Sequence, residues 1–324
     1  MAWFSDSMRV ASARVILRGL WQNTGMALVF IALLAAVSIF VPDFLSWVNM
    51  QGLALSVATV GIISCTMLFC LAGGDFDLSV GSVVAASGVL AAVVINRSGS
   101  VALAIAAGIL AGGAVGLVNG TVIARFRINA LITTLATMQI VRGLAYLVSD
   151  GKAIGIREAS FFALGISSFL SIPTPVWIMI ACFVVFGLLL NRTSFGRKTL
   201  AIGGNYEAAR LSGIAVVRTK ITIFTLQGLI AGFAGVILTS RMTSGQPATA
   251  QGLELQVISA CVLGGVSLTG GVGTMTGVVV GVLIMGTVQN AMNLLNMPPF
   301  YQYVASGGIL LAAVMFDRLK QRRG

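Results

Sequence analysis

Long apolar runs follow one another along most of this chain, and they limit what it can fold into. Hydrophobic residues make up 57% of the 324 residues and charged residues only 9%, whereas a soluble domain carries about 25% charged residues. A helix needs about 20 consecutive apolar residues to cross the hydrocarbon core of a bilayer. We therefore predict an all-α integral membrane protein with about ten transmembrane helices. The predicted spans cover residues 25–41, 52–72, 78–95, 101–124, 129–148, 175–191, 220–240, 253–269, 274–294 and 300–316.

The runs extend from end to end, so residues 1–324 are predicted to form a single transmembrane domain. A net charge of +11 could indicate nucleic-acid binding. The charges, however, lie between the runs and at the two termini, without a basic stripe interleaved with aromatic residues. We expect the lipid bilayer as the surroundings of this chain and no nucleic acid as a partner.

The positions of Lys and Arg predict the orientation, because segments on the cytoplasmic side of a membrane are rich in these residues. Most Lys and Arg fall on one side when the N-terminal segment 1–24 is placed in the cytoplasm and sides alternate after it. Residues 149–174 then form a periplasmic loop, and residues 191–219 form a cytoplasmic loop. The C-terminal tail 317–324 is also cytoplasmic, and the first apolar run is expected to remain as an uncleaved span.

Several kinds of chemistry have no residues to support them. The chain has no histidine, and its four cysteines lie inside apolar runs without a close CxxC pair, so we expect no metal and no cofactor. Lys198-Thr199 lacks the upstream glycines of a phosphate-binding loop, which predicts a chain that is not an enzyme and does not hydrolyse ATP itself. Only Asp75, Asp77 and Glu254 fall near membrane depth, which is little equipment for ion coupling.

Two glycine-rich stretches, residues 73–82 and 263–273, interrupt the apolar runs. Non-helical backbone at membrane depth is tolerated only where protein covers it or where it lines a water-filled cavity. We expect broken or re-entrant segments at both stretches. Small residues also let membrane helices approach closely, and the candidate packing faces are Gly108, Gly112 and Gly116 on one run and Gly228 and Gly232 on another.

The cytoplasmic loop contains a short stretch with clear helix signals at both ends. Asn205 is a good N-cap residue, Glu207 suits the positive start of a helix, and Gly213 suits its end. These residues predict a short helix over 206–212. Such a helix between two spans is either a simple connector or a docking element.

Hydroxyl and carboxyl groups in two further stretches allow two interpretations each. Asp77 or Ser79 can cap the helix that follows them, or one of them can contact a molecule that passes through the membrane. Thr133 and Thr137 share one helix face with Thr134 beside them. Their hydroxyls can face a polar solute or bond to backbone carbonyls of their own helix.

Three stretches together resemble ABC-importer permeases of the ribose and branched-chain amino acid type. They are the loop from Thr193 to Ile214, the stretch from Gly73 to Ser82 and the stretch from Asn129 to Tyr146. The Gly73 stretch resembles the Gly-Gly-Ile-Asp-Leu-Ser-Val-Gly pattern of sugar permeases, with an additional acid at Asp75. The resemblance extends from residue 25 to residue 318.

The resemblance implies the permease subunit of an ATP-driven importer of a monosaccharide in the bacterial inner membrane, with L-arabinose as the expected sugar. Ribose, galactose and xylose are alternatives, as is an ion-coupled secondary transporter. The implied partners are a cytoplasmic ABC ATPase subunit, a periplasmic sugar-binding protein and a second copy of this chain, with the pathway formed by the homodimer.

The same resemblance implies roles for particular residues. In the family a short cytoplasmic helix sits in a groove of the ATPase, which would make the coupling residues Gly203, Asn205, Glu207, Ala208, Ala209 and Gly213. The fifth span lines the pathway, and the candidate pathway residues are Thr133, Thr134, Thr137, Asp77 and Ser79. Exposed charges on the periplasmic side are candidates for docking the binding protein, or they are simply solvated; the candidates are Lys152, Arg157 and Arg241.

Overall fold

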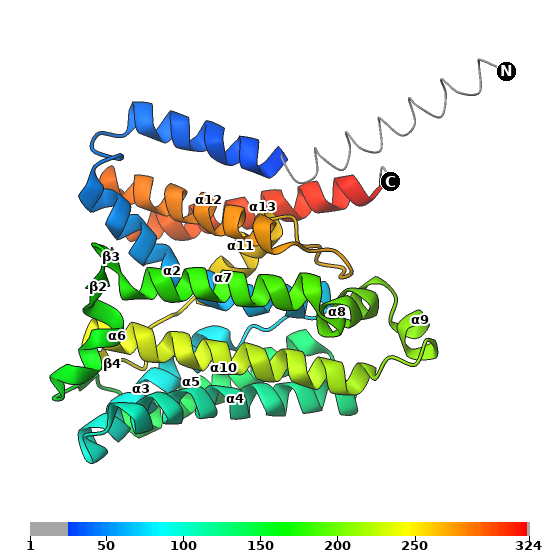
Figure 1. The fold of residues 1–324 in the computed structure, drawn as a ribbon, viewed down its shortest axis with the longest axis horizontal. Coiled ribbons are helices and arrows are strands. Elements are labelled where there is room, and N and C mark those ends of the chain that lie inside the picture. The colour runs from blue at the N-terminus through cyan, green and yellow to red at the C-terminus, as the bar shows by residue number, and fades with distance from the viewer. Residues whose placement is uncertain (1–24, 323–324) are drawn as a thin grey trace.

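The structure is a computed structural model that describes residues 25–322, and most of these residues lie in helices. The predicted N-terminal segment 1–24 and the last two residues lie outside the described part. Long helices run side by side along one direction (Figure 1). The helices α8 and α9 lie at one end of this bundle, which we call the α9 end. The strands β2, β3 and β4 lie at the opposite end, which we call the strand end.

The first described helix covers Gly25–Phe40. The elements that follow are α2 (Trp47–Ala72), α3 (Val80–Ser98), α4 (Val101–Arg125), α5 (Ala130–Ser149), β1 (Ile154–Gly155), η1 (Ala159–Phe162), α6 (Ala163–Ile166), β2 (Ser168–Phe169), β3 (Ile172–Pro173), α7 (Thr174–Arg192), α8 (Ser194–Gly204), α9 (Tyr206–Leu211), α10 (Val216–Met242), β4 (Ser244–Gly245), α11 (Leu253–Leu263), α12 (Met275–Leu294) and α13 (Pro299–Arg322).

Seven helices of the described chain are long and apolar enough to cross a membrane: α2, α3, α4, α5, α7, α10 and α12. The helices Gly25–Phe40 and α11 are apolar but shorter. A helical span over residues 253–269 is therefore wrong, since α11 ends at Leu263 after 11 residues. The cause is Gly264-Gly265, because Gly265 has a φ of +83° that glycine adopts without strain.

The two predicted breaks are both present. Residues 73–79 between α2 and α3 are not helical, and α3 begins at Val80, inside the predicted break 73–82. Residues 264–274 between α11 and α12 are also not helical. The predicted cytoplasmic loop 191–219, in contrast, is mostly helical, because α7 continues to Arg192 and α8 follows it before the expected short helix.

Helix α2 forms the centre of the core. Residues such as Ile62, Ile63 and Met67 are fully enclosed, and α2 contacts α7, α10, α11 and α12. All four cysteines are free thiols, three of them buried and Cys182 half-buried. The three buried cysteines therefore serve as small packing residues of the core.

Glycines bring α4 and α10 into direct backbone contact. A Cβ atom on Gly112 would lie 2.3 Å from the carbonyl oxygen of Gly228, and one on Gly116 would lie 2.1 Å from that of Phe224. Dispersion forces between closely packed backbones stabilise such helix pairs where lipid surrounds them. The interpretation of these glycines as packing residues is confirmed.

Short strands modify the all-α prediction at the strand end. β1 pairs antiparallel with β4, and β2 pairs antiparallel with β3, with two residues in each strand. The predicted loop 149–174 is also anchored by Phe161, which is fully buried and whose carbonyl accepts a hydrogen bond of 2.7 Å from the Ser240 hydroxyl. The loop therefore packs on the helices as a structured cover.

Replacing Gly116 by valine should destabilise the protein, because its Cβ would meet the Phe224 carbonyl, a backbone atom that cannot rotate away. Overpacking of this kind costs about 1–3 kcal/mol. The midpoint of thermal unfolding of the detergent-solubilised protein should fall. Gly52→Ala is the control, since a Cβ there meets nothing within 4 Å. Equal midpoints for the two variants would contradict the close packing of α4 on α10.

Candidate functional site

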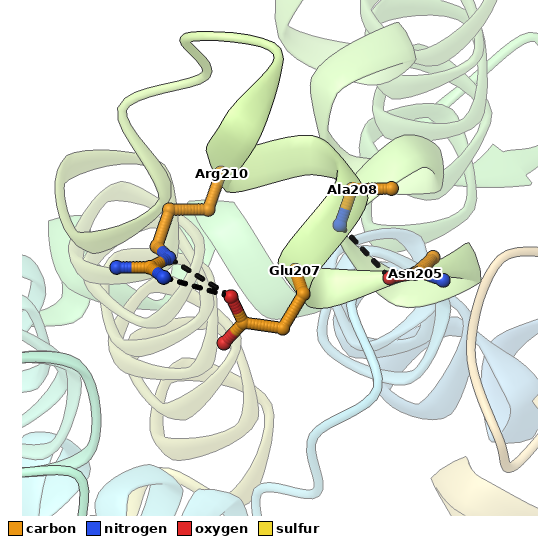
Figure 2. A network of polar contacts seen from close by, with 4 residues as sticks. All are labelled: Asn205, Glu207, Ala208 and Arg210. Carbon is orange, nitrogen blue, oxygen red and sulfur yellow. Dashed lines mark hydrogen bonds and ion pairs between the residues drawn. The ribbon is translucent and has the colours of Figure 1, made fainter.

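Helix α9 is short and is capped by its own residues at the α9 end. The Asn205 side-chain oxygen accepts a hydrogen bond of 2.9 Å from the Ala208 N–H, and Arg210 binds Glu207 through two contacts of 2.9 and 3.0 Å. Figure 2 shows these two interactions along the same helix. Gly213 has a φ of +81° and ends the turn that follows α9. The predicted helix, its N-cap and its glycine stop are confirmed.

The residues of α9 divide between an inner and an outer side. Tyr206 and Ala209, three positions apart, pack in a small apolar cluster with Ile202 and Val216. Glu207, Ala208 and Leu211 are exposed, and Leu211 keeps 81% of its surface accessible. Of the predicted coupling residues, Ala209 therefore fixes α9 to the protein, whereas Glu207 and Ala208 face outward.

Glycine backbones connect the end of α8, which leads into the base of α9, to the two breaks at residues 73–79 and 264–274. A Cβ on Gly203 would lie 1.9 Å from the Ala72 carbonyl oxygen, and one on Gly270 would lie 2.8 Å from the Gly203 Cα. The Gly271 N–H also donates a hydrogen bond of 2.8 Å to the Ala72 carbonyl. The end of α8, the segment 73–79 and the segment 264–274 thus meet at one point, where no side chain fits.

An ion pair lies next to this contact. The Lys220 ammonium is 2.7 Å from the Asp75 carboxylate, and the two side chains are only 14% and 13% exposed. The Lys220 nitrogen also lies 5.6 Å from the centre of the Tyr206 ring, within the range of a cation–π contact. All three residues line a cavity of about 250 Å³, together with Arg127 and Asn129 from the corner between α4 and α5.

A chain of buried hydrogen bonds begins two residues after Asp75. The Ser79 hydroxyl donates to the Asp77 carboxylate at 2.6 Å, and the Asn119 side-chain N–H donates to the Ser79 hydroxyl at 3.0 Å. The Thr137 hydroxyl in turn donates to the Asn119 side-chain oxygen at 2.7 Å. This polar chain joins the segment 73–79 to α4 and α5.

The structure separates the capping roles predicted for Asp77 and Ser79. Asp77 accepts a hydrogen bond of 2.9 Å from the Ser79 N–H, so it stabilises the turn into α3. Ser79 is the N-cap residue by position, but its side chain makes no capping hydrogen bond. The prediction that the Ser79 hydroxyl caps α3 is therefore wrong, because this hydroxyl bonds to Asp77 and Asn119 instead.

The threonines of α5 are not equivalent. The hydroxyls of Thr133 and Thr134 donate to carbonyl oxygens of Asn129 and Ala130 in their own helix, and both side chains are buried. Thr137 alone of the three directs its hydroxyl to another helix, where Asn119 accepts it.

The basic residues proposed for docking lie at the strand end in different surroundings. Lys152 and its ion-pair partner Asp150 are 83% and 96% exposed, and Arg157 is exposed as well. Arg241 is half-buried, and its guanidinium donates a hydrogen bond of 3.1 Å to the Leu55 carbonyl. Lys152 and Arg157 are thus available to a partner, whereas Arg241 binds within the chain.

Asn119, Lys220 and Tyr206 are the residues that sequence reasoning missed. Asn119 could have been found as a polar amide in an otherwise apolar run, where side chains without a partner are costly. Lys220 begins a predicted span, but nothing in the sequence pairs it with Asp75. Within residues 25–322, no three metal-ligating side chains come together.

The bundle of membrane-length helices and the short capped helix at one end define a polytopic helical membrane protein. The chain belongs to the family described as branched-chain amino acid transport system / permease component, whose model matches residues 49–314. It is therefore an integral membrane permease.

The curated relatives name sugars. The chain is 63% identical over 303 residues to the L-arabinose transport system permease protein of Escherichia coli (strain K12), covering 94% of this chain and 92% of that protein. It is 61% identical over 310 residues to the L-arabinose ABC transporter permease protein of Azospirillum brasilense, covering 94% and 91%. It is 42% identical over 318 residues to the ribose import permease protein of Bacillus subtilis (strain 168), covering 98% and 99%. No solved structure matches the chain.

Replacing Asn205 by alanine should loosen α9. The variant removes the hydrogen bond to the Ala208 N–H, and losing an N-cap costs about 1 kcal/mol. Hydrogen exchange at the α9 amides should accelerate by about fivefold. Asn205→Asp keeps an acceptor oxygen and should exchange as the wild type does. Unchanged exchange in Asn205→Ala would show that α9 does not depend on this cap.

Proposed function

We propose that this chain is the transmembrane permease subunit of an ATP-driven importer that carries L-arabinose across the bacterial inner membrane. The observation that carries the proposal is 63% identity over 94% of the chain to a protein named as an L-arabinose transport system permease. Ribose is the next candidate, because a ribose import permease is 42% identical over 98% of the chain.

ATP would be hydrolysed by a separate ABC ATPase subunit on the cytoplasmic side, and α9 would be its docking element. The outer side of α9 suits a protein partner, because it presents the exposed apolar side chain of Leu211 beside the charged Glu207. The inner side, through Tyr206 and Ala209, holds α9 on α8 and α10. A helix fixed in this way passes a push from its partner to the bundle.

The chain would cross the membrane about ten times, with the α9 end and both termini in the cytoplasm. In support, α13 ends toward the same side of the bundle as α8 and α9 (Figure 1). Two copies would form the pathway beside α5. Thr137, which is half-buried, would border it, whereas Thr133 and Thr134 are buried and bond to their own helix, so they would act on the shape of α5 from within. The window of α5 that would lie in the membrane is only 22% buried within one chain, which leaves most of it available to a second copy, to lipid or to the pathway.

A periplasmic sugar-binding protein would deliver the sugar at the strand end. Lys152 and Arg157 are the candidates for contacting it because their side chains are exposed there. Arg241 would act indirectly, by holding the adjacent turn against α2 through its hydrogen bond to Leu55.

The proposed substrate is tested by uptake into proteoliposomes. The purified chain is reconstituted with its ATPase, and labelled L-arabinose or ribose is supplied with the matching binding protein. We expect ATP-dependent uptake of L-arabinose that exceeds uptake of ribose. Uptake that needs no ATPase and stops when an ion gradient is collapsed would instead identify a secondary transporter.

The proposed docking role of α9 is tested by Glu207→Arg and Ala208→Asp. Both side chains are exposed, so the variants should insert into the membrane normally. Uptake and co-purification of the ATPase should fall by about tenfold or more, since truncating or reversing a contact at the centre of an interface costs 2 kcal/mol or more.

A swapped pair separates docking from helix stability. The double variant Glu207→Arg with Arg210→Glu keeps an ion pair within α9 but reverses its charges toward the partner. Docking predicts that uptake stays low in the swapped variant. Full recovery of uptake would mean that these residues only stabilise α9.

A further inference from the structure

We propose that the segment 73–79 transmits movement of α9 to α5. Lys220 binds the segment on one side, and Asn119 binds it on the other. The inference rests on the proposed function and assigns positioning roles to Asp75, Lys220 and Asn119. The segment is suited to this role because it is short and lies between two spans, and because both of its acids bind residues of other elements or of the turn into α3.

The first of these contacts joins the start of α9 to the segment. Tyr206 is the first residue of α9, its ring lies by the Lys220 ammonium, and Lys220 binds Asp75. Separating the two charges costs free energy, because an ionised group with little access to water requires a partner. A displacement of α9 and the start of α10 must therefore take Asp75 with it or break a nearly buried ion pair.

The second contact joins the segment to α5. Each donor in the polar chain has a single role, because the Ser79 hydroxyl has one proton and gives it to Asp77. Ser79 can then only accept from Asn119, and the amide oxygen of Asn119 can only accept from Thr137. The chain therefore has one arrangement, and it holds α3, α4 and α5 in a defined relation to the segment.

Close glycine packing restricts movement at the start of the segment. Gly74 has a φ of +82°, and the preceding Ala72 carbonyl is enclosed by Gly203 and Gly271 at backbone distance. Packed backbones transmit displacement because they cannot be compressed. The segment is thus linked to α8 and α9 at one side and to α5 at the other.

The ion pair is tested with three variants in the reconstituted complex: Asp75→Asn, Lys220→Met and the two combined. Each single variant leaves one nearly buried charge unpaired and should reduce the amount of folded protein in the membrane. The double variant removes both charges, so folding and ATPase binding should return. The amount of sugar imported per ATP hydrolysed should nevertheless stay about tenfold below wild type, a typical loss for an interrupted coupling.

The double variant is decisive because a purely structural ion pair predicts a different result. If the pair only stabilises the fold, sugar import per ATP returns together with protein abundance, and the proposal is overturned. Lys220→Arg is the conservative control, since it keeps a cation opposite Asp75 and should preserve coupling.

The polar chain is tested with Asn119→Leu, which removes the link between Ser79 and Thr137. Thr121→Val is the matched control on the same helix, because among the described residues the Thr121 hydroxyl bonds only to the Leu117 carbonyl of α4. We expect Asn119→Leu to lower sugar import per ATP by about tenfold, with ATPase binding retained, and Thr121→Val to behave as the wild type. Normal coupling in Asn119→Leu would exclude the polar chain from the route.

These experiments distinguish failure of the route from failure of the proposed function. Absence of ATP-dependent sugar uptake by the wild-type complex would reject the function. Wild-type uptake together with normal coupling in the double variant and in Asn119→Leu would reject only the route.

Discussion

The carbonyl of Ala72 is the point on which the architecture of the α9 end depends. In a bilayer, each backbone polar group must find a partner within the protein, and the two glycine-rich breaks, residues 73–79 and 264–274, are not helical. The Gly271 N–H satisfies the Ala72 carbonyl, while the backbone of Gly203 covers it. Both breaks are therefore closed against each other and against the base of α9.

This closure explains why the breaks and α9 occupy the same place. A side chain at Gly203, Gly270 or Gly271 would separate the three segments and leave backbone groups without partners. The polar residues nearby follow the same requirement. Asp75 has Lys220, Asp77 has Ser79, and the amide of Asn119 is used on both sides. Polar groups in this part of the chain are few: Asp75 and Asn119 bind other structural elements, and Asp77 binds within its own segment.

The two ends of the bundle differ in how they meet their surroundings. At the α9 end, a small helix presents an apolar residue and charges on its outer side and is held from within by two apolar residues. At the strand end, the segment after α5 folds into short strand pairs and a buried Phe161, which leave Lys152 and Arg157 exposed. This asymmetry fits an importer subunit that meets a different partner at each end.

The sequence by itself determined those features whose physics is local. Run length predicted the seven membrane-length helices of the described chain, but it also predicted a span over 253–269 of which α11 covers only the first 11 residues. Gly264-Gly265 lies in the predicted break after α11, and Asn205 with Gly213 marked α9, because capping and positive φ act within a few residues. The family was also evident from the sequence. Only the tertiary structure decided that Asp75 pairs with Lys220, that Asn119 joins Ser79 to Thr137, that Ser79 does not cap α3 and that Arg241 binds Leu55. These contacts join residues far apart in the chain, and helix packing, which a linear pattern does not encode, sets which of them meet.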